Sequence, residues 1–211
     1  EVSESTRTAT FTPGRDAARK EASKLNVPRI GVRFRLPASM NQVEYFGRGP
    51  AENYLDRNAG SMVGLYKSTA EELYFPYVRP QENGHHTDTR WVSLSTGKKG
   101  LLIQADNTIG FNALRNSIED FDDEEATGLP RQWSNFTPEQ VANHDEAAAK
   151  NVLRRQHHIN DITPRDFVEV CVDLKQQGVA GYDSWGSRPE PAYTLPANRE
   201  YNWGFTLIPL K

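Results

Sequence analysis

The sequence contains little cysteine, because Cys171 is the only one among 211 residues. A single thiol excludes an internal disulfide framework and a zinc site built from cysteines. Cys171 lies in an apolar pattern that is typical of a β-strand, where a free cysteine is usually a small buried hydrophobe. A hydrophobic core, rather than covalent cross-links, must therefore hold the fold together.

Long hydrophobic runs and an excess of positive charge are also missing. No segment approaches the roughly 18 apolar residues that a membrane span requires, and the first residues do not resemble a signal peptide. The formal net charge is −3 and the isoelectric point is about 6.0, so no basic field would attract nucleic acid or anionic lipid. We therefore expect neither nucleic acid nor a membrane as a partner.

What the sequence does contain is the composition of a soluble globular protein. Hydrophobic residues make up 36% of the chain and aromatic residues 10%, which is enough for a substantial core. Charged residues make up 25% and keep the surface hydrated. A chain of this length can form two small domains, but a single β-sandwich is the simpler expectation.

Alternating hydrophobicity predicts most of the secondary structure. Apolar and polar residues alternate over 29–36, which predicts a half-buried strand. Over 167–174 the residues on both faces of the expected strand are largely apolar, which predicts an interior strand. A last strand is expected over 201–207. Weaker strand candidates are 42–46, 73–78, 87–95, 100–106 and 109–114. Turns rich in Gly, Pro and Asn separate these segments, so the sequence predicts an all-β fold of two antiparallel sheets.

Helix signals are confined to the middle of the chain, where one or two short helices are expected. Residues 137–140 have the form of a capping box with proline at the first helical position, and 145–155 would extend or follow that helix. The acidic segment 119–125 is better explained by a solvated loop than by a calcium site. Residues 1–27 are polar and are expected to form a loose arm or an insertion, with 8–11 as a candidate edge strand.

Three segments resemble signatures of the C-terminal small-chain domain of glycoside hydrolase family 2 β-galactosidases. They are residues 45–57 (YFGRGPAENYLDR, the first motif), 76–84 (PYVRPQENG, the second motif) and 183–185 (DSW, the third motif). Their order and spacing are similar to those of the family, and the resemblance extends from about residue 28 to the end. Residues 28–211 are therefore expected to form the β-sandwich domain, as a fragment of a longer chain. Residues 1–27 and the 119–150 segment match nothing in this pattern.

The resemblance implies a galactose mutarotase-like antiparallel supersandwich packed against a TIM-barrel catalytic domain. The whole enzyme would be a homo-oligomer that hydrolyses terminal non-reducing β-D-galactosides, and its expected partners are the galactoside and the other domains. Retaining hydrolysis uses two carboxyl groups, which in this family are glutamates of the barrel. We therefore expect no catalytic residue here and an inactive isolated fragment. The family's magnesium and sodium sites are likewise expected in other domains, so no cofactor or metal is expected here. The compartment is not predicted, and a bacterial cytoplasmic or periplasmic enzyme would fit.

Trp185 is the residue expected to bind substrate. By resemblance, it reaches into the neighbouring barrel's site and presents its ring to the sugar. An indole face covers the C–H face of a sugar ring while the hydroxyls at the ring edge stay free to hydrogen bond. The glycines and prolines over 178–191 predict an irregular loop here, not a strand. Weaker candidates for substrate binding are Glu82, Asn83, His86 and Arg90.

Other interpretations of these residues stay open at this point. Glu52 and Glu82 are better suited to hydrogen bonding turn backbone than to catalysis, and Arg90 is expected to anchor a carboxylate such as that of Glu82. Adjacent histidines on a strand point to opposite faces, so His85 and His86 should not share a metal. The alternatives are a stand-alone carbohydrate-binding module, a mutarotase-like aldose epimerase, and a structural, oligomer-forming domain that buries its tryptophan.

Overall fold

A computed structural model describes residues 5–11, 26–78, 80–121, 159–183 and 185–211. These residues form eight strands and three short 3₁₀ turns. The strands are β1 (Ser5–Phe11), β2 (Arg29–Pro37), β3 (Gln42–Gly49), β4 (Met62–Thr69), β5 (His86–Ser95), β6 (Gly100–Leu114), β7 (Phe167–Gln176) and β8 (Tyr201–Leu210). The 3₁₀ turns span Ile118–Asp120, Ile159–Asp161 and Pro191–Tyr193.

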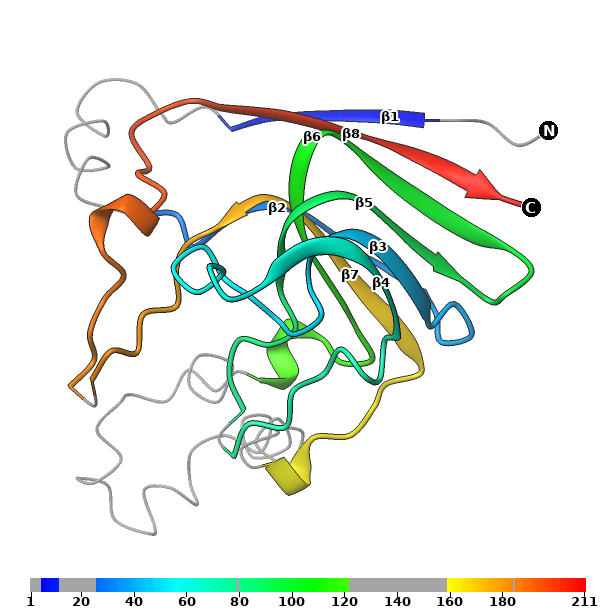
Figure 1. Cartoon of the computed structure of the whole chain (residues 1–211), viewed down its shortest axis with the longest axis horizontal. Helices are drawn as coiled ribbons and strands as arrows, with labels where there is room; N and C mark the ends of the chain where they lie inside the picture. Colours follow the sequence, from blue (N-terminus) through cyan, green and yellow to red (C-terminus); the bar gives the residue numbers. More distant parts are fainter. Residues whose placement is uncertain (1–4, 12–25, 79, 122–158, 184) are drawn as a thin grey trace, which may run out of the picture.

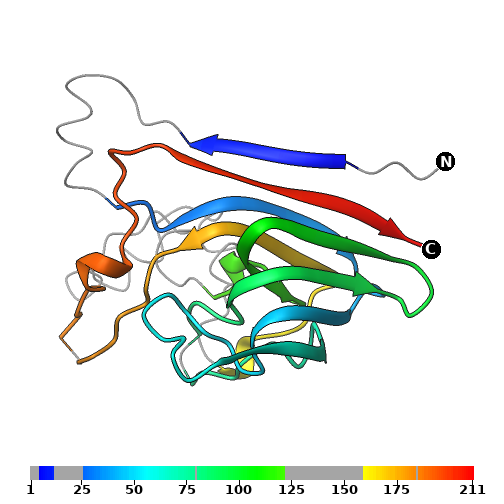
Figure 2. The same ribbon diagram turned by 45° about the horizontal axis from the view of Figure 1, so that its top comes forward.

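All the strand pairs are antiparallel, and the long strand β6 organises them (Figure 1). Its first part, Gly100–Ala105, pairs with β8, and its second part, Gly110–Leu114, pairs with β7. One path therefore runs β1-β8-β6-β5-β3-β4, while β7 and β2 continue from the other half of β6. Figure 2 shows β1 alongside β8 at one side of the molecule.

One main core fills the space between these strands, with side chains from β3, β5, β6, β7 and β8. Its buried members include Tyr45, Leu94, Ile103, Phe111, Val170 and Phe205. The predicted all-β antiparallel fold is thus confirmed. The strand predicted over 167–174 is interior, because β2 and β6 flank β7 and its residues 168–173 are buried. Burial also raises the pKa of the Cys171 thiol to about 12, as suits an inert core cysteine.

Strand β2 is half-exposed, as the alternation predicts. Phe34 and Leu36 pack against the main core, whereas Arg33 and Arg35 on the other face reach the carboxylate of Glu169. The candidate edge strand over 8–11 is also confirmed, because β1 pairs with β8 along its whole length.

Three strand predictions need correction. The segment 73–78 is not a strand, because turn hydrogen bonds hold it, including Leu73 N–H to Thr69 O and Tyr74 N–H to Glu71 O. The segments predicted separately at 100–106 and 109–114 form the single strand β6. Strand β4 was not predicted, because it is an edge strand whose apolar residues are largely exposed, so its sequence lacks clear alternation.

Several predictions fall wholly or partly outside the described residues. Both helix predictions, 137–140 and 145–155, lie there, as does most of the acidic segment. Of that segment, Glu119 pairs with Arg33, and Asp120 pairs with Arg165. The division between an arm over 1–27 and a domain over 28–211 stays a prediction. Within the described ranges, no helix has the length and apolar character that crossing a membrane would need.

Candidate functional site

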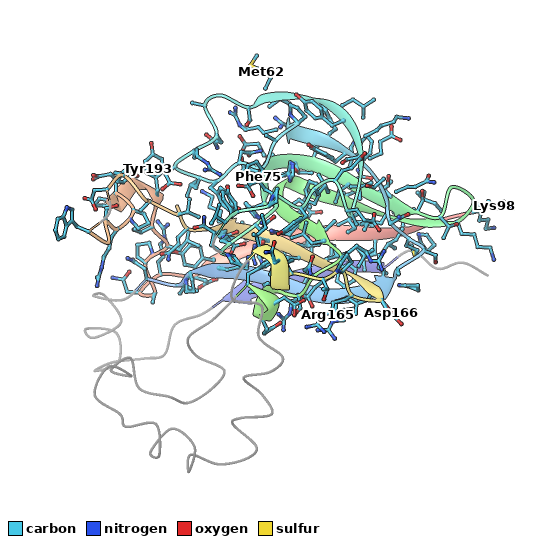
Figure 3. The ribbon with its side chains drawn as sticks, turned by 90° about the horizontal axis from the view of Figure 1, so that it is seen from below. Met62, Phe75, Lys98, Arg165, Asp166 and Tyr193 are labelled. Atoms are coloured by element: carbon cyan, nitrogen blue, oxygen red, sulfur yellow. The ribbon has the colours of Figure 1, made fainter. Side chains whose placement is uncertain are left out.

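The three motifs meet at one end of the sheet. The first motif covers the last residues of β3 and the loop that follows it. The second motif precedes the neighbouring strand β5, and the third follows β7. Asn53 N–H of the first motif donates to the carbonyl of His85, next to the second motif, at 2.7 Å, and Ala180 N–H, in the loop that leads to the third motif, donates to Asp56 Oδ2 of the first at 2.7 Å. Figure 3 shows Tyr193 at the opposite side of the molecule from Lys98, which lies in the β5–β6 turn.

Glu52 connects the first two motifs through its carboxylate, whose side chain is 5% exposed. Oε2 accepts hydrogen bonds from Gly84 N–H at 2.7 Å and from the Tyr54 hydroxyl at 3.0 Å. Oε1 accepts from Arg57 at 2.8 Å and from the Tyr77 hydroxyl. This carboxylate therefore holds loop backbone and side chains, as the sequence predicts.

The asparagines of the same motifs have similar roles. Asn53 donates to the carbonyls of Arg48 and Ala51 and accepts from the backbone N–H and hydroxyl of Thr87. Asn83 binds both the N–H and the C=O of Phe75, at 2.9 and 2.6 Å. Both amides are buried and bind the backbone of neighbouring segments, so they shape loops.

The two histidines are enclosed by protein. His85 lies 2.8 Å from Asn112 Oδ1, and the ring nitrogens of His86 face the carbonyls of Gly84 and Pro50 at 3.1 and 3.3 Å. Burial lowers the pKa of both imidazoles, that of His85 to about 3, so both are neutral near pH 7. A histidine that opens a sugar ring must exchange protons with a ligand, and neither of these side chains reaches the surface.

The expected pairing of Arg90 with Glu82 is wrong. Glu82 Oε1 instead lies 3.5 Å from Arg29 Nη2. Arg90 donates to the Asp88 carbonyl and lies over the Phe46 ring. The β5–β6 register shifts on both sides of Thr89, and Asp88 has a φ of 51°, so this irregularity redirects Arg90.

Sequence reasoning also missed a buried polar network around Arg29. Its guanidinium donates to Asn112 Oδ1 and Gln176 Oε1, each at 2.7 Å, and its Nε lies 3.0 Å from Asp173 Oδ2. Burial raises the pKa of Asp173 to about 7, although Arg29 opposes the shift. A cavity of about 290 Å³ lies beside this network, and two of its polar lining residues are already paired, Glu82 with Arg29 and Asn112 with the Asn83 carbonyl.

Trp185 is the most exposed large hydrophobic residue that the structure describes, at 94%. The loop that carries it is irregular, as predicted, and includes Gly181 and Gly186 with positive φ. Asp183 Oδ1 accepts a hydrogen bond from Trp185 N–H at 2.7 Å. The ring is therefore not part of this chain's own core, while burial of the ring between subunits of an oligomer stays an open alternative.

Asp56, which was not singled out from the sequence, contacts the same loop. Its Oδ1 accepts from Val179 N–H at 3.1 Å, and its Oδ2 accepts from Ala180 N–H at 2.7 Å and from the Tyr182 hydroxyl at 3.4 Å. A groove of about 460 Å³ lies beside it, between the loop of the first motif and Tyr193. The only sequence signal was the place of Asp56 within the first motif.

Metal binding has no support in the part of the chain that the structure describes. No group of three or more His, Cys, Asp and Glu side chains is arranged there to hold an ion.

Comparison with known proteins connects these motifs to one family. A family model described as "Beta galactosidase small chain" matches residues 3–207. A beta-galactosidase of Priestia megaterium is 35% identical over 185 residues, which are 87% of this chain and 15% of that protein. A beta-galactosidase of Arthrobacter sp. is 40% identical over 111 residues, or 50% of this chain and 11% of that protein. One from Vibrio cholerae is 29% identical over 181 residues, or 86% and 14%. The chain thus spans 11 to 15% of the length of these relatives.

Proposed function

Because the chain belongs to the beta-galactosidase small chain family, we propose that it is the C-terminal accessory domain of a family 2 retaining β-galactosidase. The complete enzyme would hydrolyse terminal non-reducing β-D-galactosides. This domain would buttress the catalytic barrel and contribute Trp185 to the sugar site.

The exposure of Trp185 is the observation that carries this proposal. A tryptophan is usually buried to a large extent in a folded protein, yet 94% of this residue is exposed although hydrogen bonds hold its loop. An exposed indole on an anchored loop suits a site completed by a second surface, here the barrel and its bound galactoside. The ring face would cover the C–H face of the sugar.

The engagement of Glu52 and Glu82 supports catalysis by another domain. Glu52 accepts hydrogen bonds from four groups, and Glu82 pairs with Arg29. Retaining hydrolysis needs two carboxyl groups about 5 to 5.5 Å apart across the sugar, and these two are engaged in holding the fold. Metal sites would likewise belong to other domains.

Hydrolysis of a chromogenic β-galactoside tests the proposal, with this chain and the full-length protein assayed side by side. We expect turnover by the full-length protein and none by this chain. Turnover by this chain alone would mean that it contains its own pair of catalytic carboxylates, and the accessory-domain proposal would fail.

A further inference from the structure

We infer that Asp56 is a positioning residue, which holds the loop that carries Trp185 and thereby sets the affinity of the sugar site. The inference rests on the proposed function for its effect on substrate, whereas the anchoring itself is independent of that function. It links the first motif to the loop that carries the third, because Asp56 and Val179 are 123 positions apart in the sequence.

The first argument is the contact itself. The two carboxylate oxygens of Asp56 accept separate backbone N–H groups from consecutive residues, Val179 and Ala180. Hydrogen bonds to an ionised acceptor are stronger than those between neutral groups. Two such bonds to adjacent amides fix both the place and the orientation of this peptide segment.

The second argument is the backbone conformation that these bonds hold. Ala180 has a φ of 54° and Gly181 a φ of 85°. A non-glycine residue in the left-handed region is disfavoured and persists only where surrounding contacts enforce it. The bond from Ala180 N–H to Asp56 is such a contact, and the turn it stabilises leads directly to the Asp183–Trp185 segment.

The third argument is the close approach of the loop at Gly178. A Cβ atom at this position would lie 2.5 Å from both Cγ and Oδ2 of Asp56, which is closer than real contacts allow. The loop therefore packs directly on the carboxylate, and any larger residue would force the two apart.

Asp56 is itself held rigidly. It lies in a tight turn in which Tyr54 and Arg57 exchange backbone hydrogen bonds of 3.3 and 2.8 Å. The side chains of both residues bind Glu52, which in turn holds Gly84 of the second motif. The anchor of the Trp185 loop is thus continuous with the buried framework of the first two motifs.

The experiment uses the full-length enzyme with Asp56→Ala, Asp56→Asn, Gly178→Ala and Trp185→Ala. Asp166→Ala is the matched control, because Asp166 is exposed and lies across the molecule from Tyr193 (Figure 3). Amide hydrogen exchange at Val179 and Ala180 measures how firmly the loop is held. KM and kcat for a chromogenic β-galactoside measure substrate binding and turnover at the sugar site. The double variant Asp56→Ala/Trp185→Ala reports whether one residue acts through the other.

We expect Asp56→Ala and Gly178→Ala to accelerate exchange at both amides by about tenfold or more, because local opening becomes easier. Asp56→Asn, which keeps one acceptor, should fall between Asp56→Ala and the parent protein. KM should rise in Asp56→Ala by about twofold to tenfold, as in Trp185→Ala, and the double variant should be no worse than Trp185→Ala alone. Asp166→Ala should match the parent protein.

Unchanged exchange at Val179 and Ala180 in Asp56→Ala would overturn the inference. Additive KM effects in the double variant would also overturn it, because Asp56 would then act independently of Trp185. If Trp185→Ala leaves KM unchanged, the proposed role of the tryptophan fails, and the exchange data alone then decide whether Asp56 holds the loop.

Discussion

The residues at the end of the sheet where the three motifs meet have two different roles. Most of them hold loops in place, and one of them faces outwards. Glu52, Asn53 and Asn83 are buried or nearly so, and their polar atoms bind neighbouring loops. Trp185 has the opposite character, because its ring is exposed while its backbone is bound. The motifs therefore combine structural residues with one residue suited to recognition.

Trp185→Ala in the full-length enzyme should weaken substrate binding without unfolding the domain. Loss of an aromatic stacking partner costs about 0.5–1.5 kcal/mol, which corresponds to a rise in KM and inhibitor constants of about 2-fold to 10-fold. Thermal unfolding should change little, because the ring is 94% exposed. Trp185→Tyr, which keeps an aromatic face, should retain most of the affinity. Unchanged KM and inhibitor constants in Trp185→Ala would contradict the proposed role.

His85 should make the domain less stable in acid. Its pKa falls from an ordinary 6.5 to about 3 on folding, because burial disfavours the imidazolium. The unfolded chain takes up a proton below about pH 6.5 and the folded chain does not. The stability that neutral His85 contributes is therefore complete above pH 6.5 and is lost as the pH falls towards 3.

The measurement is urea denaturation of the parent chain and His85→Gln at about pH 7 and about pH 5. The parent should lose more free energy of unfolding than His85→Gln between these pH values. Asp173, whose Oδ2 lies 3.8 Å from His85 Nδ1 and whose raised pKa acts in the opposite direction, is present in both proteins and opposes the acid loss in each. Equal losses in the two proteins would show that His85 does not cause the acid sensitivity.

The burial of a strand depends on its partner strands as well as on its own composition. Strands β2 and β7 are paired, with Val32 opposite Val172, and both show apolar alternation. Yet β7 also pairs with β6 and is interior, whereas β2 has β7 as its only partner strand among the described residues. Val172 is fully buried, and Val32 is 36% exposed.

This pair allows a matched test, since the same substitution can be made on two facing strands. Val172→Ala should lower the free energy of unfolding by about 1.5–3 kcal/mol, because it removes buried methyl groups and leaves a cavity. Val32→Ala should cost less than about 1 kcal/mol, since part of its surface is already in water. Chemical denaturation of both variants would check the order, and equal losses would contradict the interior position of β7.

The whole molecule presents its three motifs at one end, although they are distant in the sequence. The chain spans only 11 to 15% of the length of its relatives. On the proposed function, this end would face the other domains of the enzyme. The exposed Trp185 and the groove of about 460 Å³ that Asp56 lines would then form one side of a shared site, because Asp56 also binds the loop that carries Trp185.

One side of a site should bind a monosaccharide weakly by itself. We expect this chain to bind galactose with a Kd in the range of about 1 mM or weaker, because one stacked ring cannot offset the entropy lost on association. Titration followed by tryptophan fluorescence or NMR would measure it. Micromolar binding by this chain would instead support a stand-alone carbohydrate-binding module.

The sequence by itself determined the class of fold and most of the strands. Where one face of a strand meets the core, the pleat imposes a period of two on hydrophobicity, so 29–36, 167–174 and 201–207 could be recognised. The glycines and prolines around Trp185 likewise predicted an irregular loop, because their backbone preferences are local. The motifs indicated the family by resemblance, and the family model over residues 3–207 confirmed it.

Only the tertiary structure decided which distant groups meet. The edge strand β4 has no fully buried residue to mark it, and the continuity of β6 depends on its different partners along its length. The bond from Asp56 to Ala180 joins residues 124 positions apart, and the partner of Arg90 depends on an irregularity in β5. Local patterns report the environment of each residue, but contacts of this kind arise from the packing of whole strands and cannot be deduced from short-range sequence.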